Sequence, residues 1–145
     1  MATRESKVHS WRFLRTLVKD PFSVGAVAPS SRYLANSMVI GMGPGAKVIE
    51  LGGGTGSVTQ AILNSGVSPQ DLIVIEQNEE FVELLKERFP HVTVIRANAA
   101  SPRHHIAELT GPADFVVSGL PLMLFPAKRK ARLLSQMFGA LRPKG

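Results

Sequence analysis

An acidic residue followed by four closely spaced glycines is the stretch of this 145-residue sequence whose residue types and spacing point most directly to chemistry. Glycine tolerates positive φ angles and lets a ligand come close to the backbone. The helix expected after the glycines begins with N–H groups that have no partner inside the helix. The stretch therefore predicts a turn that binds a nucleotide-like ligand, and its residues are Glu50, Gly52, Gly53, Gly54 and Gly56. A glycine turn without a ligand is the alternative.

The spacing of these glycines distinguishes three kinds of nucleotide site. A P-loop ends in Gly-Lys-Ser or Gly-Lys-Thr, and no lysine follows the glycines here. A dinucleotide fingerprint needs glycine at its first, third and sixth positions, but the sixth residue is Ser57 or Thr59, depending on the glycine that starts the count. The spacing Glu50-x-Gly-x-Gly-x-Gly56 is instead similar to the acidic-x-Gly-x-Gly-x-Gly motif of class I methyltransferases. This resemblance implies S-adenosyl-L-methionine as the cofactor.

Two further positions, each after an expected strand, fit the same cofactor. Glu76 ends the second strand, where a carboxylate can accept hydrogen bonds from both ribose hydroxyls, as in dinucleotide folds. Asn98 stands where methyltransferases usually have an acidic residue, and its amide carbonyl keeps an acceptor for the adenine amino group. We predict that both residues bind the cofactor, together with their neighbours Gln77 and Ala99.

Short apolar runs alternate with helical patterns along the elements that must position these residues. We expect strands at 47–51, 72–76, 92–96 and 115–118, and helices at 32–40, 58–64, 79–88 and 127–141. Ser30 or Ser31 is the expected N-cap of the first of these helices. The alternation predicts an α/β fold, a mostly parallel sheet with helices on both faces. The resemblance of the glycine motif implies that this is the Rossmann-like sheet of class I methyltransferases. Because a full sheet of this class has seven strands, we expect a chain truncated after the fourth strand and its helix.

Composition restricts the possible partners. The sequence has no cysteine, so disulfides and thiolate chemistry are excluded. Its four histidines are scattered, so no metal site is expected. The longest apolar stretch, 113–126, is shorter than the ~20 residues that span a bilayer. The net charge of +6 favours anionic partners, either nucleic acid or an acidic lipid surface.

The N-terminal part of the chain forms a second predicted region. Residues 5–19 favour a helix that ends at Asp20-Pro21. We therefore divide the chain into a basic amphipathic helix at 1–22 and a cofactor-binding domain at 23–145. Basic side chains beside an apolar face are typical of a helix that lies on anionic lipid. The predicted membrane-binding residues are Trp11, Arg12, Arg15 and Lys19. The alternative is that the apolar face packs onto the domain.

Three stretches together make the chain resemble the bacterial phospholipid N-methyltransferases, which methylate phosphatidylethanolamine. Many methyltransferases share the glycine motif. The stretches GAVAPSSRYL at 25–34 and VVSGLPLMLFP at 116–126 are more specific to that family. The similarity extends from about residue 10 to the end of the sequence.

The resemblance implies roles for individual residues. Pro29, Ser30 and Ser31 would close over the methionine end of the cofactor, whose amino-acid portion Glu50 and the glycine backbone would hold. The residues beside the transferred methyl group would be Ser118, Gly119, Leu120 and Pro121. Tyr33 is a candidate for orienting the acceptor amine, because no strong general base stands out.

The implied function is methyl transfer to the amine of phosphatidylethanolamine by a cytoplasmic protein on the inner face of the cell membrane. The alternative is an enzyme that methylates adenine in ribosomal RNA. The related motif of those enzymes carries an aromatic residue that stacks on the extruded base. The aliphatic Leu122 stands at that position here, although Phe125 could substitute for the aromatic. A truncated module that binds cofactor or membrane without catalysis is the third possibility.

Overall fold

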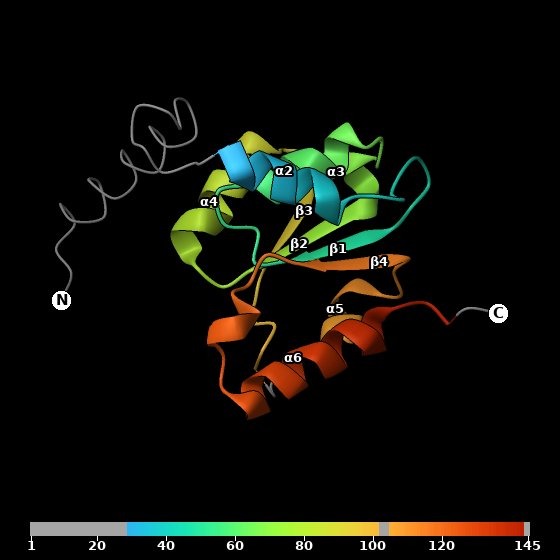
Figure 1. Cartoon of the computed structure of the whole chain (residues 1–145). Helices are drawn as coiled ribbons and strands as arrows, with labels where there is room; N and C mark the ends of the chain where they lie inside the picture. The colour runs from blue at the N-terminus through green and yellow to red at the C-terminus, as the bar shows by residue number, and fades with distance from the viewer. Residues whose placement is uncertain (1–28, 102–104, 144–145) are drawn as a thin grey trace, which may run out of the picture.

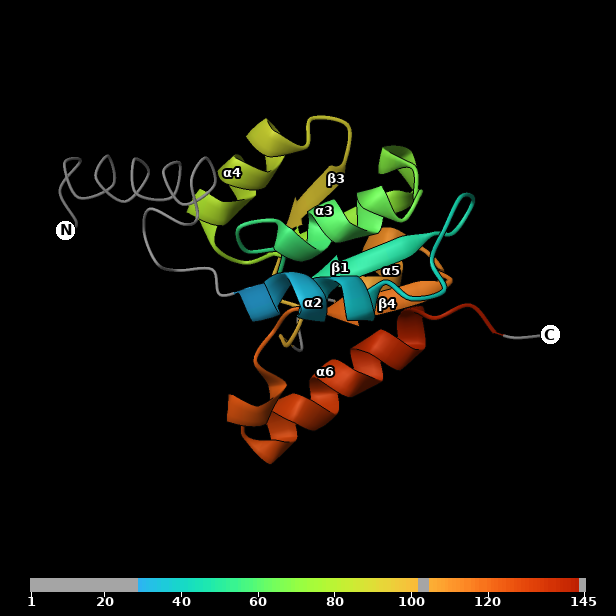
Figure 2. The same ribbon diagram turned by 45° about the horizontal axis from the view of Figure 1, so that its top comes forward.

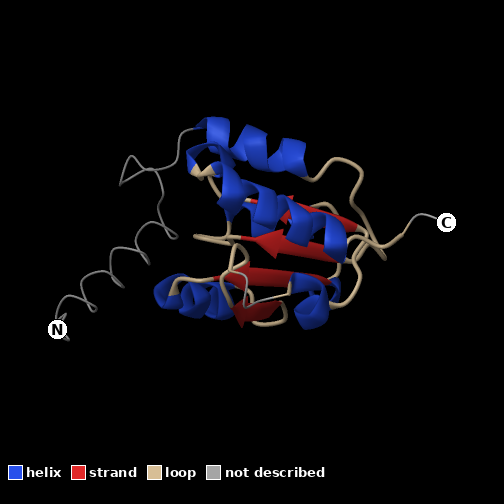
Figure 3. Ribbon diagram, turned by 90° about the horizontal axis from the view of Figure 1, so that it is seen from below, coloured by secondary structure: helices blue, strands red, loops and turns tan. Residues whose placement is uncertain are grey.

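A single parallel sheet organises the part of the chain that the computed structural model describes, residues 29–101 and 105–143. Its strands are β1 (Val48–Leu51), β2 (Leu72–Glu76), β3 (Thr93–Arg96) and β4 (Phe115–Ser118). They lie in the order β3-β2-β1-β4, and every neighbouring pair is parallel. Figure 3 shows the strand arrows pointing in the same direction. All the described strands therefore end at one edge of the sheet.

Helices cover both faces of this sheet (Figure 1). On one face lie α2 (Pro29–Met38), α3 (Ser57–Asn64) and α4 (Glu79–Arg88), and on the other lie α5 (Ile106–Thr110) and α6 (Ala127–Ala140). Two short 3-10 turns, η1 (Pro69–Asp71) and η2 (Leu122–Leu124), precede β2 and α6. The turned view in Figure 2 shows α2 and α3 side by side over β1, with α6 beyond the sheet. This is the predicted Rossmann-like methyltransferase fold.

The core is divided between the two faces because side chains alternate along each strand. From β1, Val48 packs with Ile62 of α3 and Leu85 of α4 in the first cluster. Ile49 and Leu51 pack instead with Ile106 of α5 and Leu133 of α6 in the second. The β1 residues are buried on both faces, as expected for a central parallel strand.

Local sequence explains the sharp ends of α4. The Asn78 side chain accepts hydrogen bonds from the N–H groups of Glu80 and Phe81 and so caps the first turn. The first turn is acidic and the last turn is basic, and both arrangements complement the helix dipole. The predicted bounds of α4, β2 and β4 are confirmed.

Two expectations about local structure were wrong. The helix α2 begins at Pro29, three residues earlier than predicted, so Ser30 and Ser31 lie inside its first turn and not at the N-cap. Proline is favoured at the first position of a helix because it has no N–H to leave unpaired. The short helix α5 was not predicted, since its five residues carry only one buried apolar side chain, Ile106.

The proposed N-terminal region lies outside the described residues. Its predicted helix at 5–19, including Trp11, Arg12, Arg15 and Lys19, therefore stays a prediction. Among the helices of residues 29–101 and 105–143, none has the length and hydropathy needed to cross a bilayer.

Candidate functional site

The glycine turn follows β1 directly and has the backbone geometry that the motif predicts. Gly52, Gly54 and Gly56 have φ angles of 75°, 52° and 92°, in the left-handed region that favours glycine. The N–H of Gly52 donates to the carbonyl of Ile75 (2.7 Å), and this bond fixes the start of the turn against β2. A Cβ on Gly54 would meet nothing within 4 Å, so the turn is open on this side.

The turn is in close contact with the loop that follows β4. The N–H of Gly119 donates to the carbonyl of Leu51 (2.8 Å). A Cβ on Gly119 would lie 2.9 Å from the Gly52 oxygen, and a Cβ on Gly52 would lie 2.6 Å from Leu120 Cδ2. Both glycines therefore allow a separation that side chains would prevent. Since β1 and β4 flank the point where strand order reverses, this is the expected ligand position in an open α/β sheet.

Glu76 points toward the glycine turn from the end of β2. Its Oε2 accepts a hydrogen bond from the N–H of Gly54 (2.9 Å), and its Oε1 accepts one from the N–H of Asn78 (2.9 Å). The carboxylate therefore joins the glycine turn to the start of α4. Each oxygen keeps lone pairs for further donors such as ribose hydroxyls.

A cavity of about 270 Å³ opens between the ends of β1, β2, β3 and β4. This volume is near the lower end of the ~300–1,000 Å³ that ligand pockets usually have. Polar groups from β2 and β3 line one part, and apolar groups from the loop after β4 line another. Its lining includes the predicted Gly52, Glu76, Gln77, Asn98, Ala99, Leu120 and Pro121. The Asn98 carbonyl accepts a hydrogen bond from the N–H of Ala100 (2.9 Å), and Asn98 lines the cavity.

Glu50 is fully buried beneath the turn. Its Oε2 accepts a hydrogen bond from the hydroxyl of Thr59 (2.6 Å), a buried residue of α3. Its Oε1 has no hydrogen-bond partner. Burial raises the pKa of Glu50 from 4.5 to about 7; the Thr59 hydrogen bond opposes the rise and the nearby Glu76 adds to it. An unpaired buried oxygen of this kind is suited to a cationic donor.

Other predicted residues lie apart from the cavity lining. Tyr33 is 75% exposed on α2, and Ser118 accepts a hydrogen bond from the N–H of Leu120 (3.2 Å). Gly53 and Gly56 lie against the core, because a Cβ on them would meet Val74 and Phe89. The side chains of Pro29, Ser30 and Ser31 are outside what the structure describes, so their predicted contact with the cofactor stays a prediction.

The structure adds residues that the sequence did not single out for the cofactor. Asn78, Phe125 and Arg129 line the cavity, and the Arg129 guanidinium lies 4.3 Å from the centre of the Phe125 ring. Because Phe125 lies before Pro126, the N-cap of α6, the spacing rule for side chains within one helix does not predict this contact. Thr59, the partner of Glu50, follows the last glycine of the motif by three residues, and only its burial reveals its role.

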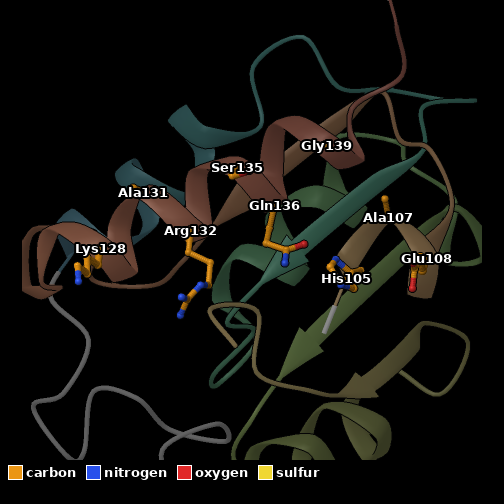
Figure 4. A pocket seen from close by; sticks show the side chains of 9 residues that line it. All are labelled: His105, Ala107, Glu108, Lys128, Ala131, Arg132, Ser135, Gln136 and Gly139. Atoms are coloured by element: carbon orange, nitrogen blue, oxygen red, sulfur yellow. The ribbon is translucent and has the colours of Figure 1, made fainter. Parts of the chain in front are cut away.

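A second hollow, of about 640 Å³, lies between α5 and α6 (Figure 4). Its lining residues include Lys128, Arg132 and Gln136 of α6, Glu108 of α5 and His105, the N-cap of α5. It shares no lining residue with the cavity at the strand ends. Among the described residues, no group of three or more His, Asp or Glu side chains could hold a metal ion.

Comparison with known proteins gives the class to which this site belongs. A family model described as a methyltransferase domain matches residues 48–145. The chain belongs to the class I methyltransferases that use S-adenosyl-L-methionine. The residues present fit this cofactor: the open side of Gly54 leaves room beside the backbone, the Glu76 carboxylate lines the cavity, and the unpaired Oε1 of Glu50 can accept from an ammonium group.

An ornithine lipid N-methyltransferase from Singulisphaera acidiphila is 34% identical over 143 residues, with 92% of this chain and 72% of that protein covered. Two solved structures share the fold. A TehB-like methyltransferase from Corynebacterium glutamicum has a TM-score of 0.61 at 19% identity, covering 94% of this chain and 66% of that one. Phosphoethanolamine N-methyltransferase 1 from Haemonchus contortus has a TM-score of 0.63 at 16% identity, covering 99% and 32%.

Proposed function

We propose that the protein transfers a methyl group from S-adenosyl-L-methionine to the primary amine of a membrane lipid. The observation that carries this proposal is the 34% identity, along 92% of the chain, to an ornithine lipid N-methyltransferase. The resemblance of residues 25–34 and 116–126 to phospholipid N-methyltransferases supports the same class of acceptor. Phosphatidylethanolamine and ornithine lipid both present a primary amine on an acylated molecule, and phosphatidylethanolamine is the acceptor that we propose first.

The cofactor supplies an electrophilic methyl group, and the chain must orient the acceptor nitrogen in line with it. Orientation of this kind is a large source of rate acceleration. The contact of Gly119 with the end of β1, and the presence of Leu120 and Pro121 in the cavity lining, support a role for the loop after β4 in this task. Leu120 and Pro121 contribute apolar side chains to the lining.

The amine must be neutral before transfer, since an ammonium nitrogen has no lone pair. A nitrogen–carbon bond then forms, the methyl–sulfur bond breaks, and a proton leaves the nitrogen for solvent. Within the described lining of the cavity the carboxylate is Glu76, and its oxygens are engaged by Gly54 and Asn78. We therefore assign no general base and expect solvent to receive the proton.

The test is methyl transfer from radiolabelled cofactor to three acceptors: phosphatidylethanolamine vesicles, ornithine lipid vesicles and ribosomal RNA. We expect label in a lipid fraction, and the two vesicle types identify the head group. Gly52→Val is the negative control, because its side chain would collide with Leu120. Label confined to RNA would overturn the proposal in favour of the nucleic-acid alternative. The Arg129 guanidinium over the Phe125 ring already disfavours that alternative, since it covers one face that a base would need.

A further inference from the structure

The turn η2 presents two large apolar side chains to solvent. Met123 is 88% exposed and Leu124 is 81% exposed. The residues on either side of them, Leu122 and Phe125, are partly buried against the second core cluster. Hydrogen bonds from the N–H of Leu124 to Pro121 (3.0 Å) and from the N–H of Phe125 to Leu122 (3.2 Å) hold the turn. Because both ends of the turn are anchored, Met123 and Leu124 must project outward.

Four cations follow this turn on the first part of α6: Lys128, Arg129, Lys130 and Arg132. The sequence has no Asp or Glu from residue 115 to its end. Within residues 29–101 and 105–143, no carboxylate pairs with Lys128, Lys130 or Arg132. Cations in the first turn of a helix oppose its dipole, so helix stability does not explain their position. We call Met123, Leu124, Lys128, Lys130 and Arg132 the η2–α6 surface.

The cations point in different directions around the start of α6. In Figure 4, Lys128 and Arg132 project from the same side of the helix toward the hollow beside α5, where Glu108 is the acidic residue of the lining. Arg129 points to the Phe125 ring instead and lines the cofactor cavity. The apolar tip and its cations therefore border the same loop that lines the cofactor cavity through Leu120, Pro121 and Phe125.

We propose that the η2–α6 surface docks the protein on an anionic lipid bilayer, with Met123 and Leu124 inserted among the acyl chains. Apolar side chains flanked by unpaired cations are the combination by which a protein segment binds such an interface. Docking in this way turns the mouth of the cofactor cavity toward the lipid head groups. This inference rests on the proposed function for its choice of a lipid partner, and its test is independent of catalysis.

The experiment is co-sedimentation of the whole chain, without cofactor, with two kinds of vesicle: phosphatidylcholine alone, and phosphatidylcholine mixed with phosphatidylglycerol. We expect binding to the mixed vesicles only. Met123→Ser with Leu124→Ser removes the apolar tip, and Lys128→Gln with Lys130→Gln and Arg132→Gln removes the charges. Each neutralised charge should weaken binding about fivefold, and each variant should lose at least tenfold in affinity.

Matched controls carry the same chemical change elsewhere. Ile40→Ser alters a side chain that is 79% exposed in the turn after α2, and Lys86→Gln alters an exposed cation on α4. Both should bind as the parent chain does. Unchanged vesicle affinity in either η2–α6 variant overturns the proposal. A second result would also overturn the proposal. If the parent chain self-associates in lipid-free solution, and the Met123→Ser, Leu124→Ser variant loses this association but still binds vesicles, the apolar tip contacts a second copy of the chain and not lipid.

Methyl transfer to a short-chain, monomeric phosphatidylethanolamine separates docking from catalysis. The η2–α6 variants should keep this activity and lose transfer to mixed vesicles. Loss of transfer to both acceptors in a variant that still binds vesicles overturns the docking role. A different result is that the parent chain transfers no methyl group and still binds vesicles through the η2–α6 surface. That result would contradict the proposed function and leave the docking proposal standing.

Discussion

Glu50 is a residue whose burial carries an electrostatic cost for the fold. Its carboxyl is fully buried, one oxygen has no partner, and its pKa is raised to about 7 mainly by burial. A carboxyl of this kind favours the folded state in its protonated form. Its contribution to stability is therefore complete below pH 4.5 and is lost as the pH rises through about 7.

Glu50→Gln tests this electrostatic cost. The amide keeps an acceptor for Thr59 and has no charge, so the variant should gain roughly 3 kcal/mol over the parent chain above about pH 8. The difference should disappear well below pH 4.5, where the parent carboxyl is protonated in both states. Urea unfolding of both chains at several pH values measures it. A difference that is independent of pH would contradict the raised pKa.

Glu76→Ala tests the second acidic residue, which we predict to grip the ribose. The substitution removes an acceptor for the sugar and also the bonds that join Gly54 to Asn78. We expect the affinity for S-adenosylhomocysteine to fall severalfold or more, because a lost hydrogen bond to a charged group costs about 1.5–3 kcal/mol. Titration calorimetry measures the change. Unchanged affinity would contradict the assignment of Glu76 to the ribose. The control is Glu79→Ala, which removes an exposed carboxylate three residues away.

At the scale of elements, the glycine turn fits against its neighbours through three close contacts that are possible because glycine has no side chain. Gly52 and Gly119 let the loops after β1 and β4 approach each other, and Gly53 lets the turn settle on β2 and α4. The first two contacts shape the ligand cavity, while the third is a matter of packing. The motif therefore combines binding and packing requirements that its spacing alone does not separate.

Gly53→Ala tests the packing requirement. The added methyl would lie 2.5 Å from Val74 Cγ1 and 2.8 Å from Leu85 Cδ1, and both side chains are buried. Overpacking of this kind costs about 1–3 kcal/mol. Gly139→Ala is the matched control on α6, where an added Cβ meets nothing within 4 Å. This substitution should stabilise the helix by about 0.5–1 kcal/mol. Equal effects of the two substitutions on the midpoint of urea unfolding would contradict the packing role.

At the scale of the whole molecule, the cofactor cavity joins the ends of all the described strands. Its lining comes from the segments after β1, β2, β3 and β4. A ligand there contacts elements that are far apart in the sequence, and it should stabilise the fold as a unit. The chain covers 72% of the ornithine lipid N-methyltransferase that it resembles.

S-adenosylhomocysteine should therefore raise the melting temperature. A ligand present at a hundred times its dissociation constant stabilises a protein by about 2.7 kcal/mol, which corresponds to about 5–10 °C for a domain of this size. Differential scanning calorimetry measures the shift. Glu76→Ala should show a smaller shift at the same ligand concentration, and an unchanged melting temperature in the parent chain would argue against binding in the cavity.

Much of this architecture follows from local sequence. The alternation of apolar runs with helical patterns predicted β2, β4 and α4 to the residue, because these elements carry their own caps and buried strand cores. The spacing of Glu50, Gly52, Gly54 and Gly56 resembles the class I methyltransferase motif, and this resemblance implied the cofactor. The class of enzyme was thus determined by the sequence alone.

Only the tertiary structure decided which groups meet. The apolar run from Gly119 to Pro126 suggests burial throughout, yet Leu122 and Phe125 are anchored in the core while Met123 and Leu124 face solvent. The raised pKa of Glu50 comes mainly from burial by residues of other elements; the Thr59 hydrogen bond opposes the rise, and the nearby Glu76 adds to it. The burial and desolvation of a side chain depend on many neighbours that are far apart in the sequence. The spacing of residues along the chain therefore does not determine them.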